Sequence, residues 1–217
     1  MKVEIWSDIM CPFCYIGKRK FEKALAQFEN AEQVEISWKS FQLNPGMKTD
    51  PKKSINEYLS EIKGMPLEQA KEINEHVTQL AKAVGLQYNF DKAIVANSLD
   101  AHRLIQFAKE KNKDGEAEER LFKAYFTEGK NIADHATLAL LASEIGLDQE
   151  EVQSFLKSNK YTEEVNNDIA EAQKIGVRGV PFFVIDRKYG VSGAQESDTF
   201  LQALTKAWSE KISDPKL

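Results

Sequence analysis

Cys11-Pro12-Phe13-Cys14 contains the only two cysteines of the 217-residue chain, three positions apart. Before this stretch, residues 2–6 alternate polar and apolar side chains, which predicts a short strand. After it, residues 15–28 repeat apolar side chains at helical spacing with charged residues mostly on the other side, which predicts an amphipathic helix. The cysteines therefore lie at a strand-to-helix junction, where Pro12 suits the first helical turn because its missing N–H has no helical partner there.

This position predicts different reactivities for the two thiols. Free backbone N–H groups and the positive end of the helix dipole favour a thiolate on Cys11. Cys14 lies one turn further in, so its sulfur should be more covered and stay protonated until it is needed. A reachable thiolate followed by a covered partner thiol favours redox chemistry at this pair.

A Cys-x-x-Cys pair has two alternative roles, as a static disulfide or as part of a metal site. A disulfide between residues this close restricts very little chain, so it stabilises a protein of this length poorly. A structural zinc site normally needs four protein ligands. Only His76, His102 and His135 could complete one, and they are scattered along the sequence. No metal site is therefore expected.

Net charge and the length of the apolar runs argue against two classes of function, nucleic-acid binding and membrane insertion. The net charge of -5 and the pI of 5.4 argue against a nucleic-acid-binding surface. No apolar run approaches the roughly 18 residues of a membrane span, so no membrane partner is expected. Met1 leads directly into the first predicted strand, without the charged segment, apolar core and cleavage site of a leader. The expected location is the cytoplasm, where a cysteine pair is more often catalytic or metal-binding than structural.

The middle of the chain is predicted to be almost entirely helical. Residues 34–41 alternate again and predict a second strand, parallel to the first across the helix. Residues 42–53 break this pattern and predict a lysine-rich linker. Capping residues and helical periodicity then predict successive helices up to residue 174. Their expected positions are a start at the capping box of Ser54 and Glu57, then 66–84, 97–111, 116–126, 134–146, a start at Asp148, and 162–174.

Strand patterns return near the end of the chain, at residues 179–186 and 189–193. Residues 196–211 then predict a closing amphipathic helix. The order is β-α-β, a long helical block, and β-β-α. Without the block, this is the order of the thioredoxin fold, so we predict the α/β class and a thioredoxin fold with a large all-helical insertion.

The predicted domain organisation follows from this order. Residues 1–45 and 178–217 form a discontinuous thioredoxin-like domain. Residues 46–177 form a helical insertion domain. The last residues, 213–217, are expected to fray.

Motifs spread over almost the whole chain match one known family. They are Ser7-Asp8, Cys11-Pro12-Phe13-Cys14-Tyr15-Ile16-Gly17, Phe41-Gln42-Leu43-Asn44-Pro45, Ala96-Asn97-Ser98, Ala101-His102-Arg103-Leu104, and the runs 176–184 and 189–195. Together they resemble the DsbA-like thioredoxin superfamily, and most closely its FrnE-like dithiol-disulfide oxidoreductases and isomerases. The same superfamily contains glutathione transferase kappa and 2-hydroxychromene-2-carboxylate isomerase.

The resemblance implies a cis peptide bond between Val180 and Pro181, beside the cysteines. Cis bonds are almost confined to proline, and this one would turn the Val180 backbone outward, where an extended substrate could pair with it. Without the resemblance, a trans proline at a strand start is the simpler interpretation. Asn97 also suits a helix cap, which needs no function. The residues expected to contact substrate are Pro12, Phe13, Val180, Pro181, Asn44 and Asn97.

We therefore predict a thiol–disulfide oxidoreductase in which Cys11 attacks and Cys14 resolves the mixed disulfide. The expected partners are proteins or glutathione that carry thiols or disulfides, together with a reducing or oxidising recycling partner. No tightly bound cofactor is expected, and glutathione is a candidate co-substrate. The resemblance allows a homodimer, although no apolar stripe in the sequence demands one.

Two alternative functions stay open from the sequence. One is a glutathione-dependent isomerase or transferase. Such relatives typically carry serine at the position of Cys11 and a Ser-Asp or Asn-Asp pair near the start of the last helix. This chain has Gly193-Ala194-Gln195-Glu196 in that region, so both differences count against this function. The other alternative is a chaperone-like binding module, which would not need the cysteines.

Overall fold

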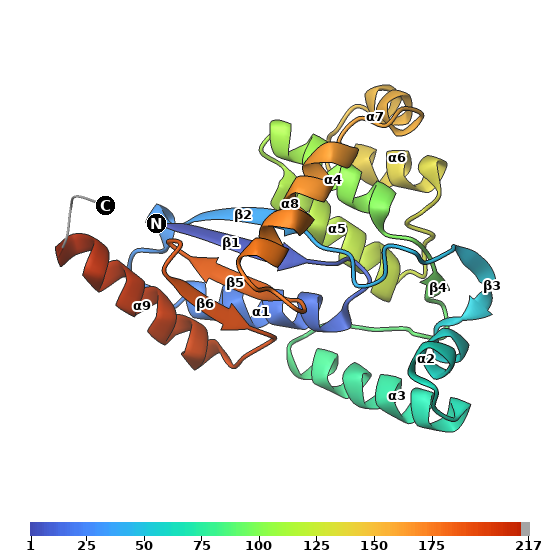
Figure 1. The fold of residues 1–217 in the computed structure, drawn as a ribbon, viewed down its shortest axis with the longest axis horizontal. Helices are drawn as coiled ribbons and strands as arrows, with labels where there is room; N and C mark the ends of the chain where they lie inside the picture. Colours follow the sequence, from blue (N-terminus) through green and yellow to red (C-terminus); the bar gives the residue numbers. More distant parts are fainter. Residues whose placement is uncertain (214–217) are drawn as a thin grey trace.

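A sheet of four strands forms the centre of the computed structural model, which describes residues 1–213 (Figure 1). The strand order is β2-β1-β5-β6. β1 is parallel to β2 and antiparallel to β5, and β5 is antiparallel to β6. This sheet, with its helices, confirms the predicted thioredoxin fold. The strands are β1 (Lys2–Ser7), β2 (Glu35–Ser40), β5 (Phe182–Ile185) and β6 (Tyr189–Ser192).

Helices α1 (Pro12–Leu25) and α9 (Ser197–Ser213) pack side by side against this sheet (Figure 1). A short 3-10 turn, η1 (Ala31–Gln33), leads from α1 into β2. Phe21 of α1, Phe183 of β5 and Phe200 of α9 form a buried aromatic cluster, with ring centroids 4.6–5.7 Å apart. Burying each ring stabilises the fold by about 1.5–3 kcal/mol. This packing fixes the orientation of α1 and of the cysteines at its start.

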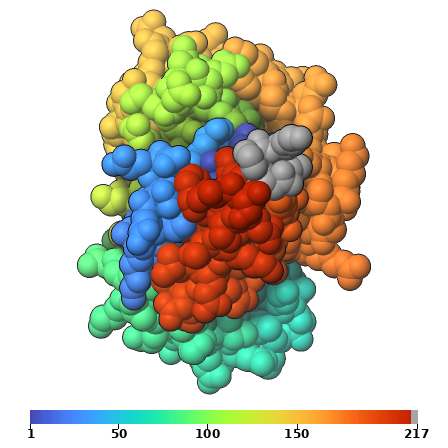
Figure 2. Space-filling model, turned by 90° about the vertical axis from the view of Figure 1, so that its left-hand side faces the viewer, coloured from blue at the N-terminus to red at the C-terminus, as the bar shows by residue number. Residues whose placement is uncertain are grey.

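The segment between β2 and β5 is mainly helical and divides into two groups. α2 and α3 pack against each other beside α1, whereas α4 to α8 gather at the β2 edge of the sheet, with α5 and α8 in contact with β2 (Figure 1). Figure 2 shows α9, in red, between the teal α2–α3 pair below and the green and orange helices above. The bounds are α2 (Ile55–Lys63), α3 (Leu67–Ala83), α4 (Leu99–Glu110), α5 (Asp114–Phe126), α6 (His135–Glu144), α7 (Gln149–Leu156) and α8 (Thr162–Lys174).

The predicted capping residues define several helix ends. Ser54 and Glu57 form the capping box of α2. The side chains of Asp134 and Asp148 accept backbone N–H groups three residues further on, at 2.8 Å and 2.7 Å, and so begin α6 and α7. Gly85 follows α3 with a φ of +81°, a conformation that glycine adopts without strain.

The predicted linker of residues 42–53 is wrong at its end. Asp50–Ser54 form strand β3, which pairs antiparallel with β4 (Ile94–Val95). The segment reads Asp-Pro-Lys-Lys-Ser and shows no polar–apolar alternation. Its strand conformation comes from pairing with a partner far along the chain, and a local pattern carries no signal of that pairing.

Other boundaries also differ from the predicted ones by two or three residues, at the ends of α1, α6 and α9 and at the starts of α4, α5 and β5. Helix α4 begins at Leu99 rather than at 97, because the Asn97 side chain accepts the Leu99 N–H at 2.9 Å ahead of the helix. Helix α5 begins at Asp114 rather than at 116. Strand β5 begins at Phe182 rather than at 179, since the ladder with β1 starts where Phe182 lies opposite Trp6.

The buried core extends from the sheet into the helical segment. One apolar cluster joins residues of β1, α1 and β5 to residues of α3 through α7 and of α9. A second one surrounds Trp6, whose indole Nε1 donates to the Asp168 carbonyl of α8 at 2.9 Å. The domain boundaries at 45/46 and 177/178 stay predictions. Residues 214–217, which the sequence predicts to fray, lie outside the described residues. Among residues 1–213, no helix is long and apolar enough to span a bilayer.

Candidate active site

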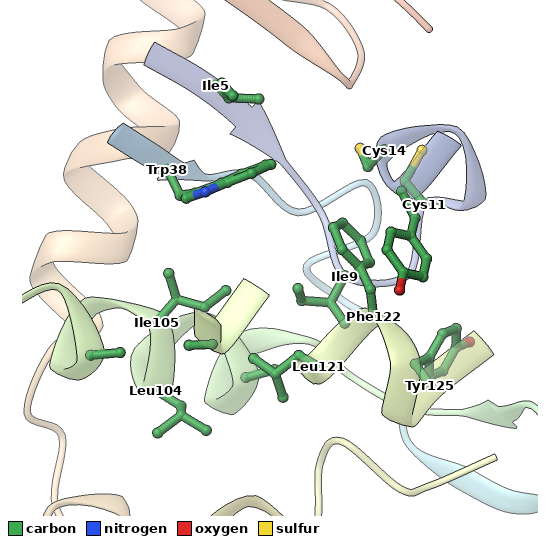
Figure 3. Packing of buried hydrophobic residues seen from close by; sticks show 14 of the residues in the cluster. Ile5, Ile9, Cys11, Cys14, Trp38, Leu104, Ile105, Leu121, Phe122 and Tyr125 are labelled. Atoms are coloured by element: carbon green, nitrogen blue, oxygen red, sulfur yellow. The ribbon is translucent and has the colours of Figure 1, made fainter. Parts of the chain in front are cut away.

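The two cysteines lie in the first turn of α1, directly after β1 (Figure 3). A turn connects the strand to the helix, in which the Cys11 N–H donates to the Asp8 carbonyl at 2.9 Å. Cys11 has extended backbone angles and is the N-cap residue, and Pro12 occupies the first helical position. The predicted strand-to-helix junction is therefore present. Pro12 fits its first helical position because an N–H there would have no acceptor within the helix.

Both cysteines are free thiols, and both are buried. Cys11 is 4% exposed and Cys14 is 1% exposed, so the expected order of coverage is present, although Cys11 is more covered than expected. The Val180 backbone lies against it, and the Cys11 thiol donates to the Val180 carbonyl at 3.5 Å. Burial, together with the neighbouring Cys11 sulfur, raises the pKa of the Cys14 thiol well above its ordinary value.

The Val180–Pro181 peptide bond is cis, as the family resemblance implies, and it lies beside Cys11. The Pro181 ring packs directly on α1 at Gly17, where a Cβ atom would lie 2.9 Å from the ring carbon Cγ. The Pro181 carbonyl accepts the Gly193 N–H at 2.8 Å, just after β6. A glycine in α1 and a hydrogen bond to the end of β6 thus hold this loop against the thiols.

Pro12 and Phe13, between the cysteines, have different surroundings. Phe13 is 42% exposed and borders a groove of about 550 Å³ between α1, α3 and the start of α9. The Pro12 carbonyl accepts a hydrogen bond of 2.7 Å from the hydroxyl of Tyr88, in the loop after α3. Burial and the proximity of both cysteines raise the pKa of Tyr88. Six of the eight predicted site residues therefore come together here: Cys11, Pro12, Phe13, Cys14, Val180 and Pro181.

The side chains of Asn44 and Asn97 bind other parts of the chain. Asn44 Nδ2 donates to the Tyr58 hydroxyl at 2.8 Å. Asn97 Nδ2 donates to the carbonyls of Pro45 and Met47 at 3.1 Å and 2.8 Å. These bonds give Asn97 a structural role, holding residues 45–47 against the start of α4. A contact of Asn44 or Asn97 with substrate stays a prediction.

Sequence reasoning missed two residues near the thiols, Tyr88 and Glu118. Tyr88 follows Gly85 in a loop, and nothing in its local pattern connects it with Pro12. Glu118 of α5 is 1% exposed, and the Ser7 hydroxyl donates to its Oε1 at 2.5 Å. A signal for Glu118 was present, because its position belongs to the apolar side of an amphipathic helix, where an acid is unusual.

No group of three or more His, Cys, Asp or Glu side chains among residues 1–213 is arranged to hold a metal ion. His102 Nε2 lies 3.4 Å from Oδ1 of Asp8, whose carbonyl accepts the Cys11 N–H in the turn before α1. The His102 side chain is 1% exposed. The described part of the site contains two free thiols at the start of α1.

Comparison with known proteins agrees with this geometry. Residues 2–205 match the family model of the DsbA-like thioredoxin domain, and the chain belongs to this family. It is similar to the crystal structure of a probable DsbA oxidoreductase from Streptomyces coelicolor, with 41% identity and a TM-score of 0.91. That similarity covers 97% of this chain and 91% of the other.

Two other solved structures share the fold at lower sequence identity. A 2-hydroxychromene-2-carboxylate isomerase is 16% identical with a TM-score of 0.71, over 98% of both chains. The cytosolic disulfide reductase DsbM from Pseudomonas aeruginosa, in a structure with GSH, is 16% identical with a TM-score of 0.63, over 100% of both chains. At such identities the likeness shows a common fold.

Proposed function

We propose that this protein is a thiol–disulfide oxidoreductase whose reacting groups are the Cys11 and Cys14 thiols. The observation that carries the proposal is the arrangement of two free thiols at the start of α1, with Cys11 against the Val180 carbonyl. Membership of the DsbA-like family supports it. The Cys14 N–H donates to the Cys11 carbonyl at 3.0 Å, so both cysteines lie in one turn, which supports the proposal further because Cys14 has to reach the Cys11 sulfur in the second step.

The reaction has two exchanges of equal form. The Cys11 thiolate attacks one sulfur of a substrate disulfide, so a Cys11–substrate disulfide forms and the other substrate sulfur leaves as a thiolate that takes up a proton. Cys14 then loses its proton and attacks the Cys11 sulfur, which forms the Cys11–Cys14 disulfide and releases the second substrate thiol. The enzyme dithiol has lost two electrons and the substrate disulfide has gained them, and substrate oxidation is the reverse sequence.

The proposed substrates are proteins or glutathione that carry thiols or disulfides. The exposed Phe13 ring beside the cysteines suits an apolar side chain of a protein substrate. An extended segment could also pair with the backbone of the Val180 loop. A separate reducing or oxidising partner would recycle the Cys11–Cys14 pair, and we propose the cytoplasm as the location, as for the cytosolic reductase DsbM.

The test is to trap the mixed disulfide. Cys14→Ser protein should form covalent adducts with proteins of a cell extract, and reducing agent should release them, because the resolving thiol is absent. Cys11→Ser protein, which keeps Cys14, is the matched control and should trap nothing. Wild-type protein should also accelerate insulin reduction. If Cys14→Ser traps no partner and the wild type does not reduce insulin, the proposal is wrong.

The same variants separate the alternative functions. Turnover of a chromene carboxylate with glutathione by a Cys11→Ser, Cys14→Ser variant would support an isomerase instead, a reaction of one structural neighbour. Suppression of aggregation by this double variant, at the wild-type level, would support a chaperone-like binding module. The oxidoreductase proposal predicts complete loss of disulfide exchange in the double variant.

A further inference from the structure

The proposed reaction begins with a thiolate on Cys11, and the cations of the first two turns of α1 are bound elsewhere. Lys18 Nζ donates to Glu119 of α5 at 2.6 Å, and Arg19 is bonded to the same carboxylate. Phe13, between the two cysteines, carries no charge. The charge on the sulfur therefore has to be stabilised by the polar backbone groups at the start of the helix.

Cys11 is the N-cap residue of α1, and an N-cap side chain accepts the N–H of the second or third helical residue. These residues are Phe13 and Cys14. The Cys14 N–H already donates to the Cys11 carbonyl at 3.0 Å, whereas the Phe13 N–H has no hydrogen-bond partner among residues 1–213. As a thiol, Cys11 donates to the Val180 carbonyl and accepts no cap bond. Once ionised, the sulfur can only accept, and the Phe13 N–H is the free donor at this cap.

The peptide group that carries this N–H has a second hydrogen bond at its other end. Its oxygen is the Pro12 carbonyl, which accepts the Tyr88 hydroxyl at 2.7 Å. A donor at the oxygen polarises a peptide group and makes its N–H a stronger donor, because successive hydrogen bonds strengthen one another. The Tyr88 hydroxyl is therefore connected to the Cys11 sulfur through a single peptide group, Pro12–Phe13.

The Tyr88 side chain is held in place by the helical segment. It is 8% exposed, and its ring stacks between Tyr15 and Phe126, with ring centroids 6.2 Å and 4.6 Å away. The next residue, Asn89, donates its N–H to the Phe126 carbonyl of α5 at 2.7 Å. Burial, together with the nearby cysteine sulfurs, raises the pKa of Tyr88, so the hydroxyl keeps its proton and stays a donor while Cys11 ionises.

We propose that Tyr88 is a positioning residue that stabilises the Cys11 thiolate by hydrogen bonding to the Pro12 carbonyl. The proposal rests on the oxidoreductase function above and assigns one source of the reactivity of its attacking thiol. A stronger Phe13 N–H increases the fraction of Cys11 that is thiolate and can attack a disulfide. It also stabilises the reduced pair relative to the Cys11–Cys14 disulfide, which makes the couple more oxidising. The loop after α3 thus supplies a working part of the redox site.

The rate at which iodoacetamide alkylates Cys11, followed against pH, tests this role. Full-length Cys14→Ser protein is compared with the Tyr88→Phe, Cys14→Ser protein, so that only Cys11 reacts and the influence of Asp8 in the preceding turn cancels. Loss of the Tyr88 hydroxyl should move the curve to higher pH, with about threefold less thiolate on its acidic side. The plateau at high pH should not fall, because a less stabilised thiolate is at least as nucleophilic. Tyr161→Phe, which loses a hydroxyl bond of 2.7 Å to Glu110, is the matched control and should leave the curve unchanged.

The position of this curve separates the proposed role from a merely structural one. A tyrosine that only anchors its loop would change the stability, or the alkylation rate by one factor at every pH, without moving the curve. A glutathione redox titration of the proteins with both cysteines should also show a less oxidising couple in Tyr88→Phe than in the wild type or Tyr161→Phe. An unmoved curve and an unchanged potential, in a protein that exchanges disulfides, would overturn the role of Tyr88 alone. A wild type that does not exchange disulfides would overturn the oxidoreductase function instead.

Discussion

Replacement of Glu118 by glutamine should remove a large pH dependence from the stability of this protein. Glu118 is 1% exposed, and burial raises its pKa from the ordinary 4.5 to about 7. At about 1.36 kcal/mol per pKa unit, the difference between these two values corresponds to roughly 3 kcal/mol of unfolding free energy. The amide of glutamine keeps an acceptor for the Ser7 hydroxyl but has no proton to lose in this pH range.

The sign follows from where each state binds the proton. The folded protein keeps the Glu118 proton up to a pH of about 7, whereas the unfolded chain releases it near 4.5. The stability contributed by the protonated group is therefore fully present below pH 4.5 and is lost as the pH rises through 7. Relative to Glu118→Gln, the wild type should lose about 3 kcal/mol across this window.

Urea unfolding of the reduced proteins, followed by tryptophan fluorescence and circular dichroism, measures this difference. The two proteins are compared at several pH values from about 4.5 to about 8.5, and their difference cancels the titration of all other groups that they share. Glu116→Gln, with an exposed side chain on the same helix, should follow the wild type at every pH. A constant difference between the wild type and Glu118→Gln would refute the reasoning, since Glu118 would then titrate alike in both states.

Three further substitutions test the geometry around the thiols. Gly17→Ala should destabilise the protein by about 1–3 kcal/mol in urea unfolding and slow insulin reduction, because its Cβ would meet the Pro181 ring at 2.9 Å. Unchanged stability would show that the Pro181 loop moves away at little cost. Tyr88→Phe keeps the aromatic stack on Phe126 but loses the 2.7 Å hydrogen bond to the Pro12 carbonyl. The unfolding free energy should therefore fall by about 0.5–1.5 kcal/mol. A melting temperature equal to that of the wild type would contradict this prediction. Phe13→His adds a positive charge beside the thiols and should make the couple more oxidising by about 30 mV, or roughly 1.4 kcal/mol, in a glutathione redox titration. An unchanged potential in Phe13→His would contradict the expectation that the residue between the cysteines sets the stability of the thiolate.

The sequence predicts those parts of the fold that depend on local patterns. The helix starts at Ser54, Asp134 and Asp148 follow from side chains that cap a helix only a few residues away. The β3–β4 pair could not be predicted in this way. Asp50 lies opposite Val95, and neither segment has the alternation of a strand that buries one face. The β3–β4 pair forms because two distant segments hydrogen-bond to each other, so neither short sequence alone predicts a strand.

The same distinction applies to the site. Cys11, Pro12 and Cys14 are consecutive or nearly so, and the strand and helix around them are visible in the sequence. Their contact with Val180, 169 residues away, entered through the family resemblance, because no local pattern carries it. Tyr88 reaches Pro12 across 76 residues and has no motif of its own. Sequence reasoning therefore predicted the positions of the two thiols, whereas the groups around them depend on the tertiary structure.

Glu118 lies between these two cases. On α5 it precedes Phe122 and Tyr125 by four and seven residues, so all three lie on one buried side of the helix. A buried carboxyl group needs a polar partner or stays protonated, and the periodicity of the helix predicts this burial. The identity of its hydrogen-bond partner cannot be predicted from the sequence, because Ser7 is 111 residues away and belongs to another element. The helical segment thus carries in its own sequence the sign of a buried acid, and only the fold shows that this acid is hydrogen-bonded to Ser7 at the end of β1.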